Sequence, residues 1–338
     1  MSSSISSSEP RPRQRRTGDA QAWRGWLLTL LSVSFGGTAF LYAAVVLLDP
    51  FATGRLTPLE HFDVASEKRM FAHAGRVRNP KFDAAIIGNS RGFALETSRL
   101  SAASGHTFTH LTQEAAAADD QLRMARLFAA ARAGRSALIV HVIDDATWCS
   151  PVRGETAYRM PWWLYEGSNL LYLRNIFSAD SLSAAFARVS MMLGLRPRNL
   201  RSDGYALWLP RDAAELRRDM LRAPRPENAA AADAPFPNLD DLARTLMQLD
   251  AAVVMFAPPV FAGVLPAAGS LAEARLAACK QKVAAIAAAR PKTVFVDALV
   301  DRESVRNPNN FIDAIHYLDP VAAEVEPGIV AAIEGLVR

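Results

Sequence analysis

The sequence predicts an α/β protein in which about five parallel strands carry helices on both faces. Short, continuous apolar runs alternate with longer amphipathic segments, and a strand buried on both sides has this kind of uninterrupted apolar run. Polar clusters follow several of the runs directly, as expected where parallel strands end at one common edge of a sheet. The five strands are expected at residues 82–88, 107–112, 137–143, 251–257 and 293–296.

The segments between these strands have the length and apolar spacing of helices. Helices are expected at residues 95–104, 117–133, 239–249, 271–289 and 320–337. The alternation is interrupted from about residue 146 to residue 237, where two short helical patterns, several tryptophans and a Pro/Ala-rich passage occur. We therefore expect one domain over residues 81–338, with this stretch inserted as a cap over the carboxyl edge of the sheet.

The amino-terminal part of the chain differs in composition from the rest. Residues 1–25 are rich in Ser, Pro and Arg, lack apolar periodicity and are predicted to be a disordered tail. This tail carries +3 of the formal net charge of +4, so the remainder is nearly neutral. The charge therefore gives no reason to expect a nucleic acid as partner.

Residues 26–48 contain no charged side chain. A helix rises ~1.5 Å per residue, so a segment of this length matches the hydrocarbon core of a bilayer. A cleavable signal peptide is the alternative, but its apolar region is usually about 7–15 residues long and ends in small residues. We expect an uncleaved signal anchor, a single-pass transmembrane helix, followed by a connector at 49–80 with some helix around residues 67–73.

Arginines before an apolar helix favour a cytoplasmic amino terminus, because positive flanks stay on that side of the membrane. The rest of the chain is then extracytoplasmic, which in a bacterium means an inner-membrane protein with a periplasmic domain. Only two cysteines occur, Cys149 and Cys279. In an oxidising compartment they form one disulfide, or they are two unrelated buried thiols; the sequence leaves both open.

A serine stands just after the first predicted strand, in the run Gly88-Asn89-Ser90-Arg91, and Asp313-Ala314-Ile315-His316 follows the last strand. A serine nucleophile needs a base to take its proton and a third group to orient that base. His316 and Asp313, three residues apart, fit those two roles. In the alternative interpretation, Ser90 caps the next helix and Asp313 caps the final one.

Other polar side chains follow the second and third predicted strands and are expected at the same edge of the sheet. Together with two neighbours of Ser90 they form the candidates for oxyanion or substrate binding: Asn89, Arg91, Gln113, Asp144 and Asp145. His141, in the middle of an apolar strand, is expected to be a core residue. No metal site and no cofactor are expected, and the absence of a Gly-rich phosphate loop after the first strand disfavours nucleotide binding.

The runs Gly88-Asn89-Ser90 and Asp313-Ala314-Ile315-His316-Tyr317 resemble the first and last sequence blocks of the SGNH (GDSL-like) hydrolase superfamily. The similarity spans roughly residues 82–338 apart from the insertion, and it is greatest to the membrane-anchored, extracytoplasmic SGNH-like proteins of bacterial envelope modification. The resemblance implies a flavodoxin-like fold, a catalytic triad of Ser90, His316 and Asp313, and esterase or O-acyltransferase chemistry.

The chain departs from the family pattern at three places. Asn89 stands where an Asp usually precedes the serine, and residues 113–116 contain no glycine to offer a main-chain N–H to the oxyanion. The strand end Ile143-Asp144-Asp145 stands where the family has an Asn side chain. Losing one oxyanion donor typically costs ~10²–10³ in rate.

We expect a membrane-anchored serine esterase or O-acyltransferase that acts on an acylated cell-envelope glycan or a similar small ester, with a membrane-bound acyltransferase as a further partner. The departures motivate an alternative from a different class. In that alternative the chain is an inactive SGNH-like module that binds glycan or a membrane partner protein.

Overall fold

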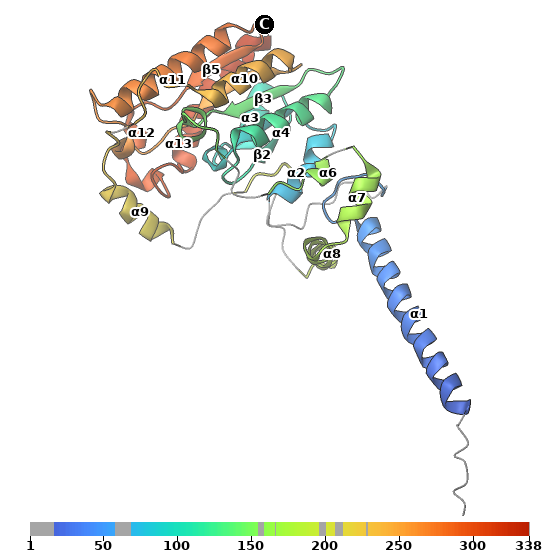
Figure 1. Cartoon of the computed structure of the whole chain (residues 1–338). Coiled ribbons are helices and arrows are strands. Elements are labelled where there is room, and N and C mark those ends of the chain that lie inside the picture. The colour runs from blue at the N-terminus through green and yellow to red at the C-terminus, as the bar shows by residue number, and fades with distance from the viewer. Residues whose placement is uncertain are drawn as a thin grey trace, which may run out of the picture.

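The computed structural model describes residues 17–57, 69–154, 159–165, 167–195, 201–206, 212–227 and 229–337. Its centre is one five-stranded, fully parallel sheet (Figure 1). The strands are β1 Ala84–Gly88, β2 Phe108–Thr112, β3 Leu138–Val142, β4 Ala252–Ala257 and β5 Thr293–Asp297. The predicted α/β class and its five parallel strands are confirmed, each strand lying within three residues of its expected bounds.

The strand order is β2-β1-β3-β4-β5, which is the order of flavodoxin-like doubly wound sheets. In the register of the sheet Gly88 pairs with Thr112 and Ile87 pairs with His141. The carboxyl ends of β1, β2 and β3 therefore lie side by side. The chain reverses its winding direction between β1 and β3, and in such sheets ligands bind outside the strand ends at this point.

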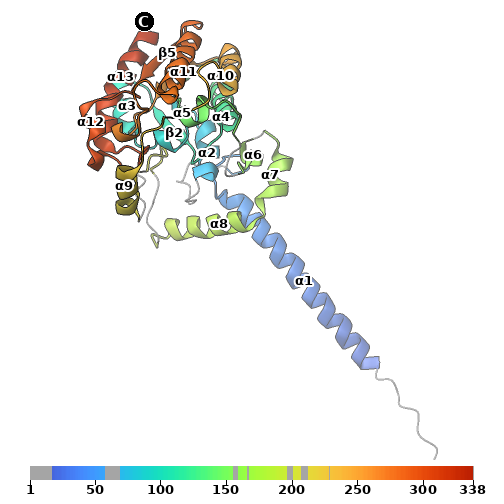
Figure 2. The ribbon, with the colours of Figure 1, turned by 60° about the vertical axis from the view of Figure 1, so that its left-hand side comes forward.

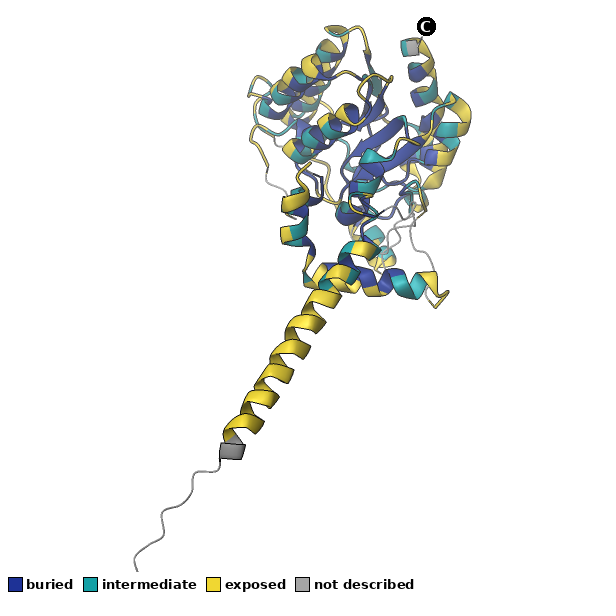
Figure 3. Cartoon of the chain, turned by 90° about the vertical axis from the view of Figure 1, so that its right-hand side faces the viewer, coloured by how far each residue is buried: buried dark blue, intermediate teal, exposed yellow. Residues whose placement is uncertain are grey.

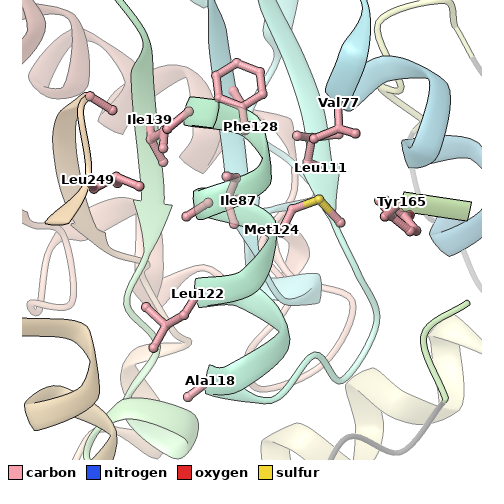
Figure 4. Close-up of a cluster of buried hydrophobic side chains, with 14 of the residues drawn as sticks. Val77, Ile87, Leu111, Ala118, Leu122, Met124, Phe128, Ile139, Tyr165 and Leu249 are labelled. Carbon is pink, nitrogen blue, oxygen red and sulfur yellow. The ribbon is translucent and has the colours of Figure 1, made fainter. Parts of the chain in front are cut away.

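Helices cover both faces of the sheet. One face carries α2 Arg69–Arg78, α4 Ala118–Ala130, α10 Pro237–Gln248 and α11 Leu271–Ala288, and the other carries α3 Thr97–Ser104 and α13 Asp319–Val337. Alternate residues of β1 serve the two layers: Ala85 and Ile87 face the first, Ala84 and Ile86 the second. Figure 4 shows the first layer, in which Ile87, Leu111 and Ile139 lie near Leu122, Met124 and Phe128.

The amino-terminal helix α1 runs from Thr17 to Leu48 and projects away from the rest of the chain (Figure 1). Residues 20–48 are long and apolar enough to cross a membrane, and most of this helix is exposed (Figure 3). Disorder was predicted for residues 1–25, but residues 17–25 are helical and extend the apolar helix at its amino-terminal end. Residues 1–16 lie outside the described residues, as does 58–68 of the predicted connector.

The stretch predicted to form one cap is spread over three places. Its helices are α5 Asp145–Trp148, α6 Trp162–Tyr165, α7 Asn169–Ile176, α8 Ala179–Met192 and α9 Ala213–Arg222. Helices α7 and α8 pack against α1, whereas residues 201–206 run beside β2, with Asp203 O accepting a hydrogen bond from His110 N at 2.7 Å. Helices α5 and α9 lie beside the carboxyl edge: α5 follows the end of β3, and Arg217 Nε of α9 donates to Phe311 O at 3.1 Å. The described helices of this stretch thus lie at several places, and a single cap over that edge stays a prediction.

Cys149 and Cys279 form a disulfide, with Cα atoms 5.5 Å apart. The bond joins the residue after α5 to the middle of α11, across 130 residues of sequence. Of the two alternatives left open by the sequence, the structure has the disulfide. The remaining short elements are α12 Glu303–Arg306 and the 3₁₀ turns η1 Ser90–Gly92, η2 Ala262–Val264 and η3 Pro308–Asn310.

Candidate active site

The structure brings Ser90, His316 and Asp313 into one hydrogen-bonded chain. Ser90 is the first residue of η1, two residues after the end of β1, and the other two lie on the loop between η3 and α13. His316 Nε2 lies 2.8 Å from Ser90 Oγ, and His316 Nδ1 lies 2.7 Å from Asp313 Oδ2. The imidazole is thus held between a hydroxyl and a carboxylate, in the arrangement of a serine nucleophile with its base and orienting acid.

The loop that carries the imidazole is fixed by its own hydrogen bonds. Asp313 Oδ1 accepts the main-chain N–H groups of Ile315 and His316, both at 2.9 Å. Ile312 N donates to His316 O at 2.9 Å, within a short antiparallel bridge that also pairs the residues on either side. These hydrogen bonds therefore fix the loop in the conformation that presents the imidazole to Ser90.

Asp313 is held in its ionised form. Burial alone raises the pKa of this carboxyl, but the hydrogen bond and charge of His316 and the two main-chain N–H donors outweigh burial and leave the pKa below its ordinary value. An ionised carboxylate accepts the Nδ1 proton, which leaves Nε2 free to accept a proton from Ser90.

Neither residue acts as the helix cap of the alternative interpretation. The cap of η1 is Asn89, whose Oδ1 accepts Arg91 N at 3.1 Å, and Ser90 is the first residue inside the turn. Helix α13 begins at Asp319, and both carboxylate oxygens of Asp313 are bonded within its own loop.

Two glycines let the turn η1, which carries Ser90 and is called the serine turn below, lie directly on β3. A Cβ atom on Gly88 would stand 2.5 Å from Val142 Cβ, and one on Gly92 would stand 2.8 Å from Val142 Cγ2. Both distances are shorter than real contacts, so a larger residue at either position would displace the turn that carries Ser90. Gly92 was not singled out from the sequence, although two glycines four residues apart around a serine were a signal for such a close approach.

Asn89 and Asp144 bind each other below the serine turn. Asn89 Nδ2 donates to Asp144 Oδ2 at 2.8 Å, and Asp144 Oδ1 accepts Thr147 N at 2.8 Å as the cap of α5. Asp144 is completely buried, and burial raises its pKa although Arg91 and Thr147 partly counter this. The expected family pattern has an aspartate at the first position and an asparagine at the second, so this chain carries the two residue types exchanged and joined by a hydrogen bond.

Arg91 and Asp145 are also partners of each other. The buried guanidinium forms an ion pair with Asp145 through Nη1, and its Nη2 donates to Pro258 O at 3.2 Å. Arg91 thus connects the ends of β1, β3 and β4. Its charge is neutralised next to the serine turn, since it is paired with a carboxylate.

The turn after β2 lies beside the serine turn, because Gln113 N donates to Gly88 O at 2.9 Å. Gln113 is buried, and its Oε1 has no hydrogen-bond partner among the described residues. Ala115 has φ +47°, in the left-handed region that favours glycine. Within residues 113–116, which contain no glycine, an alanine thus adopts a backbone conformation that favours glycine.

A small recess opens beside the serine. It is narrow, with about 10 Å³ of space that the centre of a water-sized sphere can occupy. Its lining includes Ser90 and His316 together with the apolar side chains of Phe93, Ala94, Ile312 and Leu318. The recess therefore offers a short apolar wall next to the hydroxyl and the imidazole.

Three histidines away from this site are buried and neutral. Burial lowers the pKa of His73 well below its ordinary value, and it lowers the pKa of both His110 and His141 to about 3. His141 packs edge-on against Trp148 and hydrogen-bonds Gln121, as expected for a core residue. Within the described ranges, no group of three His, Cys, Asp or Glu side chains has an arrangement that could hold a metal ion.

A comparison of the sequence with models of known protein families finds no match, and no curated protein matches either.

Proposed function

We propose that this chain is a membrane-anchored, extracytoplasmic serine esterase or O-acyltransferase of SGNH type that acts on an acylated cell-envelope glycan or a similar ester. The observation that carries the proposal is the hydrogen-bonded chain from Ser90 through His316 to Asp313, with contacts of 2.8 and 2.7 Å. The strand order supports it too, because Ser90 follows β1 at the point where doubly wound sheets bind ligands.

In the proposed reaction, Ser90 Oγ attacks the acyl carbon of the ester while His316 Nε2 takes the hydroxyl proton. The bond to the alcohol oxygen then breaks, and His316 returns the proton to the departing alcohol. The acyl group remains on Ser90 until water, in an esterase, or a glycan hydroxyl, in a transferase, attacks it with His316 again as base. Asp313 orients the imidazole and stabilises its charged form.

The oxyanion of the tetrahedral intermediate is proposed to rest on main-chain donors. The N–H groups of Ser90 and Ala115 have no hydrogen-bond partner among the described residues, and Gln113 brings the second turn beside the first. Asp144 is buried with both oxygens bonded, so its carboxylate is withdrawn from the position where it would repel the oxyanion. Main-chain donors of this kind act because they are oriented before charge develops.

The anchor and the recess favour the substrate class. Residues 20–48 are apolar enough to span a membrane, and the arginines before them favour a cytoplasmic amino terminus and, in a bacterium, a periplasmic site. The small recess with its apolar wall suits a short acyl chain better than a long one. A membrane-bound acyltransferase is the proposed partner for supplying the acyl group.

The experiment measures hydrolysis of p-nitrophenyl esters of increasing acyl length by the full chain in detergent micelles. Ser90→Ala is expected to lower the rate at least ~10²-fold, as is Asp313→Asn, because each removes a member of the proton-transfer chain. Ser98→Ala, an exposed serine eight residues away, is the matched control and is expected to keep the full rate. Equal rates for Ser90→Ala and Ser98→Ala would remove the proposed chemistry.

Binding without catalysis is the second candidate, motivated by the missing glycine at 113–116 and by the aspartates Asp144 and Asp145. A separation of Ser90 from His316 beyond hydrogen-bond reach would favour it, and the 2.8 Å contact therefore supports catalysis instead. Retained glycan binding by a chain whose ester hydrolysis does not depend on Ser90 would return the second candidate to first place.

A further inference from the structure

Helix α8 carries an apolar face that no described part of the chain covers. Its exposed side chains include Phe186 at 76%, and the face continues past the helix end at Leu193 and Leu195, exposed by 67% and 76%. The other exposed apolar members are Leu182 and Met192. On the opposite side, Ser181, Ala184, Ala185 and Arg188 are buried against the protein. We call the exposed set the α8 apolar face.

The charges of α8 do not interrupt this face. The helix, which is described in full, contains two charged residues, Asp180 in its first turn and Arg188 on its buried side. Large apolar side chains on a surface helix are otherwise scattered singly, so a contiguous set indicates a contact surface.

Helix α8 and its neighbour α7 are fixed to the end of α1. Tyr42 Oη donates to Leu173 O at 2.8 Å, and the Arg188 guanidinium donates to Asp49 O. Tyr172 Oη donates to Asp49 Oδ1 at 3.4 Å, and Asp49 is buried with φ +42° where the chain turns out of α1. Figure 2 shows α8 crossing α1 at the base of the soluble domain, on the side from which α1 extends.

The length of α1 sets the level at which α8 lies. A hydrocarbon core of about 30 Å takes ~20 helical residues. A span that begins at the exposed pair Trp23 and Trp26, residues typical of the membrane interface, therefore ends near Val45. Val45 is the first residue of α1 that is fully buried, and Tyr42 contacts Phe177 and α7 just before it. The contacts of α1 with α7 and α8 thus begin where the helix leaves the hydrocarbon.

We propose that α8 lies in the outer surface of the bilayer, with the α8 apolar face inserted at the boundary between headgroups and acyl chains. The occupant is lipid because α8 packs against α1, whose exposed apolar side chains face lipid in the proposed span, and lies at the level where that helix emerges. Amphipathic helices with such a face sit ~5–10 Å into the interface. The inference rests on the membrane anchor of the proposed function, but not on its chemistry.

A consequence of this placement is a fixed orientation of the soluble domain. One helix through the bilayer and a second one in its surface, joined through Asp49, restrain both the height and the tilt of the domain. The Ser90 recess is then held at a constant distance from the membrane, which suits an acyl donor delivered by a membrane-bound partner.

The test places a nitroxide spin label on the full chain in nanodiscs of phosphatidylethanolamine and phosphatidylglycerol. Because the two native cysteines form a disulfide, one introduced cysteine takes one label. Phe186→Cys probes the α8 apolar face, Phe35→Cys probes the exposed middle of α1, and Met247→Cys on α10, 71% exposed, is the aqueous control. Collision rates with oxygen, which concentrates in lipid, and with a water-soluble nickel chelate are measured for each label.

The proposal expects the oxygen-to-nickel ratio at Phe186→Cys to exceed that at Met247→Cys several-fold and to approach that at Phe35→Cys. A nickel-accessible label at Phe186→Cys beside a lipid-exposed one at Phe35→Cys would overturn the proposal and leave the anchor intact. Shielding from both reagents would overturn it in favour of a protein partner on this face. A water-exposed label at Phe35→Cys would overturn anchor and proposal together. Ester hydrolysis by the same samples reports the catalytic proposal separately.

Discussion

Exchanging the residues at positions 89 and 144 tests the account of the serine turn most specifically. Asn89→Asp alone replaces the amide that donates to Asp144 by a second carboxylate. Asp144→Asn alone places the amides of residues 89 and 144 opposite each other. The one side-chain oxygen at position 144 must then accept from both Asn89 Nδ2 and Thr147 N. The double variant Asn89→Asp/Asp144→Asn restores one donor opposite one acceptor, with the direction of the hydrogen bond reversed, and gives the chain the residue types of the SGNH-like pattern.

The size of the effect follows from the 2.8 Å separation of Asn89 Nδ2 and Asp144 Oδ2. Two carboxylates 3–4 Å apart repel by about 4–6 kcal/mol at an effective dielectric constant of ~20. Protonating one of them limits this cost, because taking a carboxyl of ordinary pKa to its neutral form at pH 7 costs about 4 kcal/mol. The shared proton forms a charge-assisted hydrogen bond worth ~1.5–3 kcal/mol, which replaces the bond of similar strength from Asn89. Asn89→Asp is therefore expected to lose about 4 kcal/mol, the cost of holding one carboxyl neutral.

The other two variants complete the cycle. Asp144→Asn loses one of two hydrogen bonds but also removes a buried charge whose pKa is already raised by burial, so about 1 kcal/mol is expected. The double variant satisfies Arg91 N, Thr147 N and the inter-residue bond again, and it is expected within about 1 kcal/mol of the natural chain. The two substitutions should therefore couple favourably by about 4 kcal/mol.

The dependence on pH gives an independent check of sign. In Asn89→Asp the shared site binds a proton in the folded state that an unfolded carboxyl has lost at pH 7, so its folded pKa is raised. The defect is therefore largest above the ordinary carboxyl pKa and shrinks as the pH falls toward about 4.

The assay is urea unfolding of the full chain in detergent, followed by circular dichroism, for the four chains at pH 7 and pH 5. Strictly additive losses, or a double variant as unstable as the sum of its parts, would refute a direct hydrogen bond between positions 89 and 144. A loss in Asn89→Asp that grows as the pH falls would refute the electrostatic explanation.

Three further predictions follow from the structure. The added Cβ of Gly92→Ala would meet Val142 at 2.8 Å, so this variant is expected to lower ester hydrolysis at least ~10-fold with the circular dichroism spectrum unchanged. Gly154→Ala, with open space around it, is the control and should keep the full rate. Equal rates for the two variants would contradict the close approach of Gly92 to Val142. Replacing both Cys149 and Cys279 by Ala is expected to lower the free energy of unfolding by about 2–5 kcal/mol, and no change in urea midpoint would show that the disulfide does not restrain the chain. The three buried histidines have pKa values below that of an unfolded histidine, so the folded state binds fewer protons than the unfolded state. Their contribution to stability is fully present above pH ~6.5. As the pH drops below that value, the free energy of unfolding should decrease by up to about 1.4 kcal/mol per pH unit for each histidine. A urea midpoint that is flat between pH 7 and pH 5 would argue against their burial.

The sequence predicted the sheet well, because a strand buried on both faces consists of consecutive apolar residues, which are a local signal. The grouping of Ser90, His316 and Asp313 could also be predicted, since Ser90 and His316 follow strand ends that a parallel sheet brings to one edge. The exchanged pair Asn89 and Asp144 was seen only as two departures from a pattern. That they bind each other depends on the adjacency of β1 and β3, which no local signal gives.

The placement of the inserted segment was beyond the sequence for the same reason. Helices α7 and α8 were expected above the sheet edge, but they pack on α1 through contacts such as Tyr42 with Leu173 and Arg188 with Asp49. Tyr42 and Leu173 are 131 residues apart in the sequence, and Arg188 and Asp49 are 139 residues apart. Amphipathic spacing reveals that a helix has an apolar side, but not which surface that side will meet.

The most direct test of the central claim is covalent trapping of the nucleophile. The full chain is treated in detergent with a fluorophosphonate, which reacts with serines activated by a neighbouring base, and its mass and labelled peptide are measured. One adduct per chain is expected, located on Ser90. It should be absent in Ser90→Ala and should form much more slowly in His316→Gln. An unlabelled natural chain, or an adduct that persists in Ser90→Ala, would contradict it.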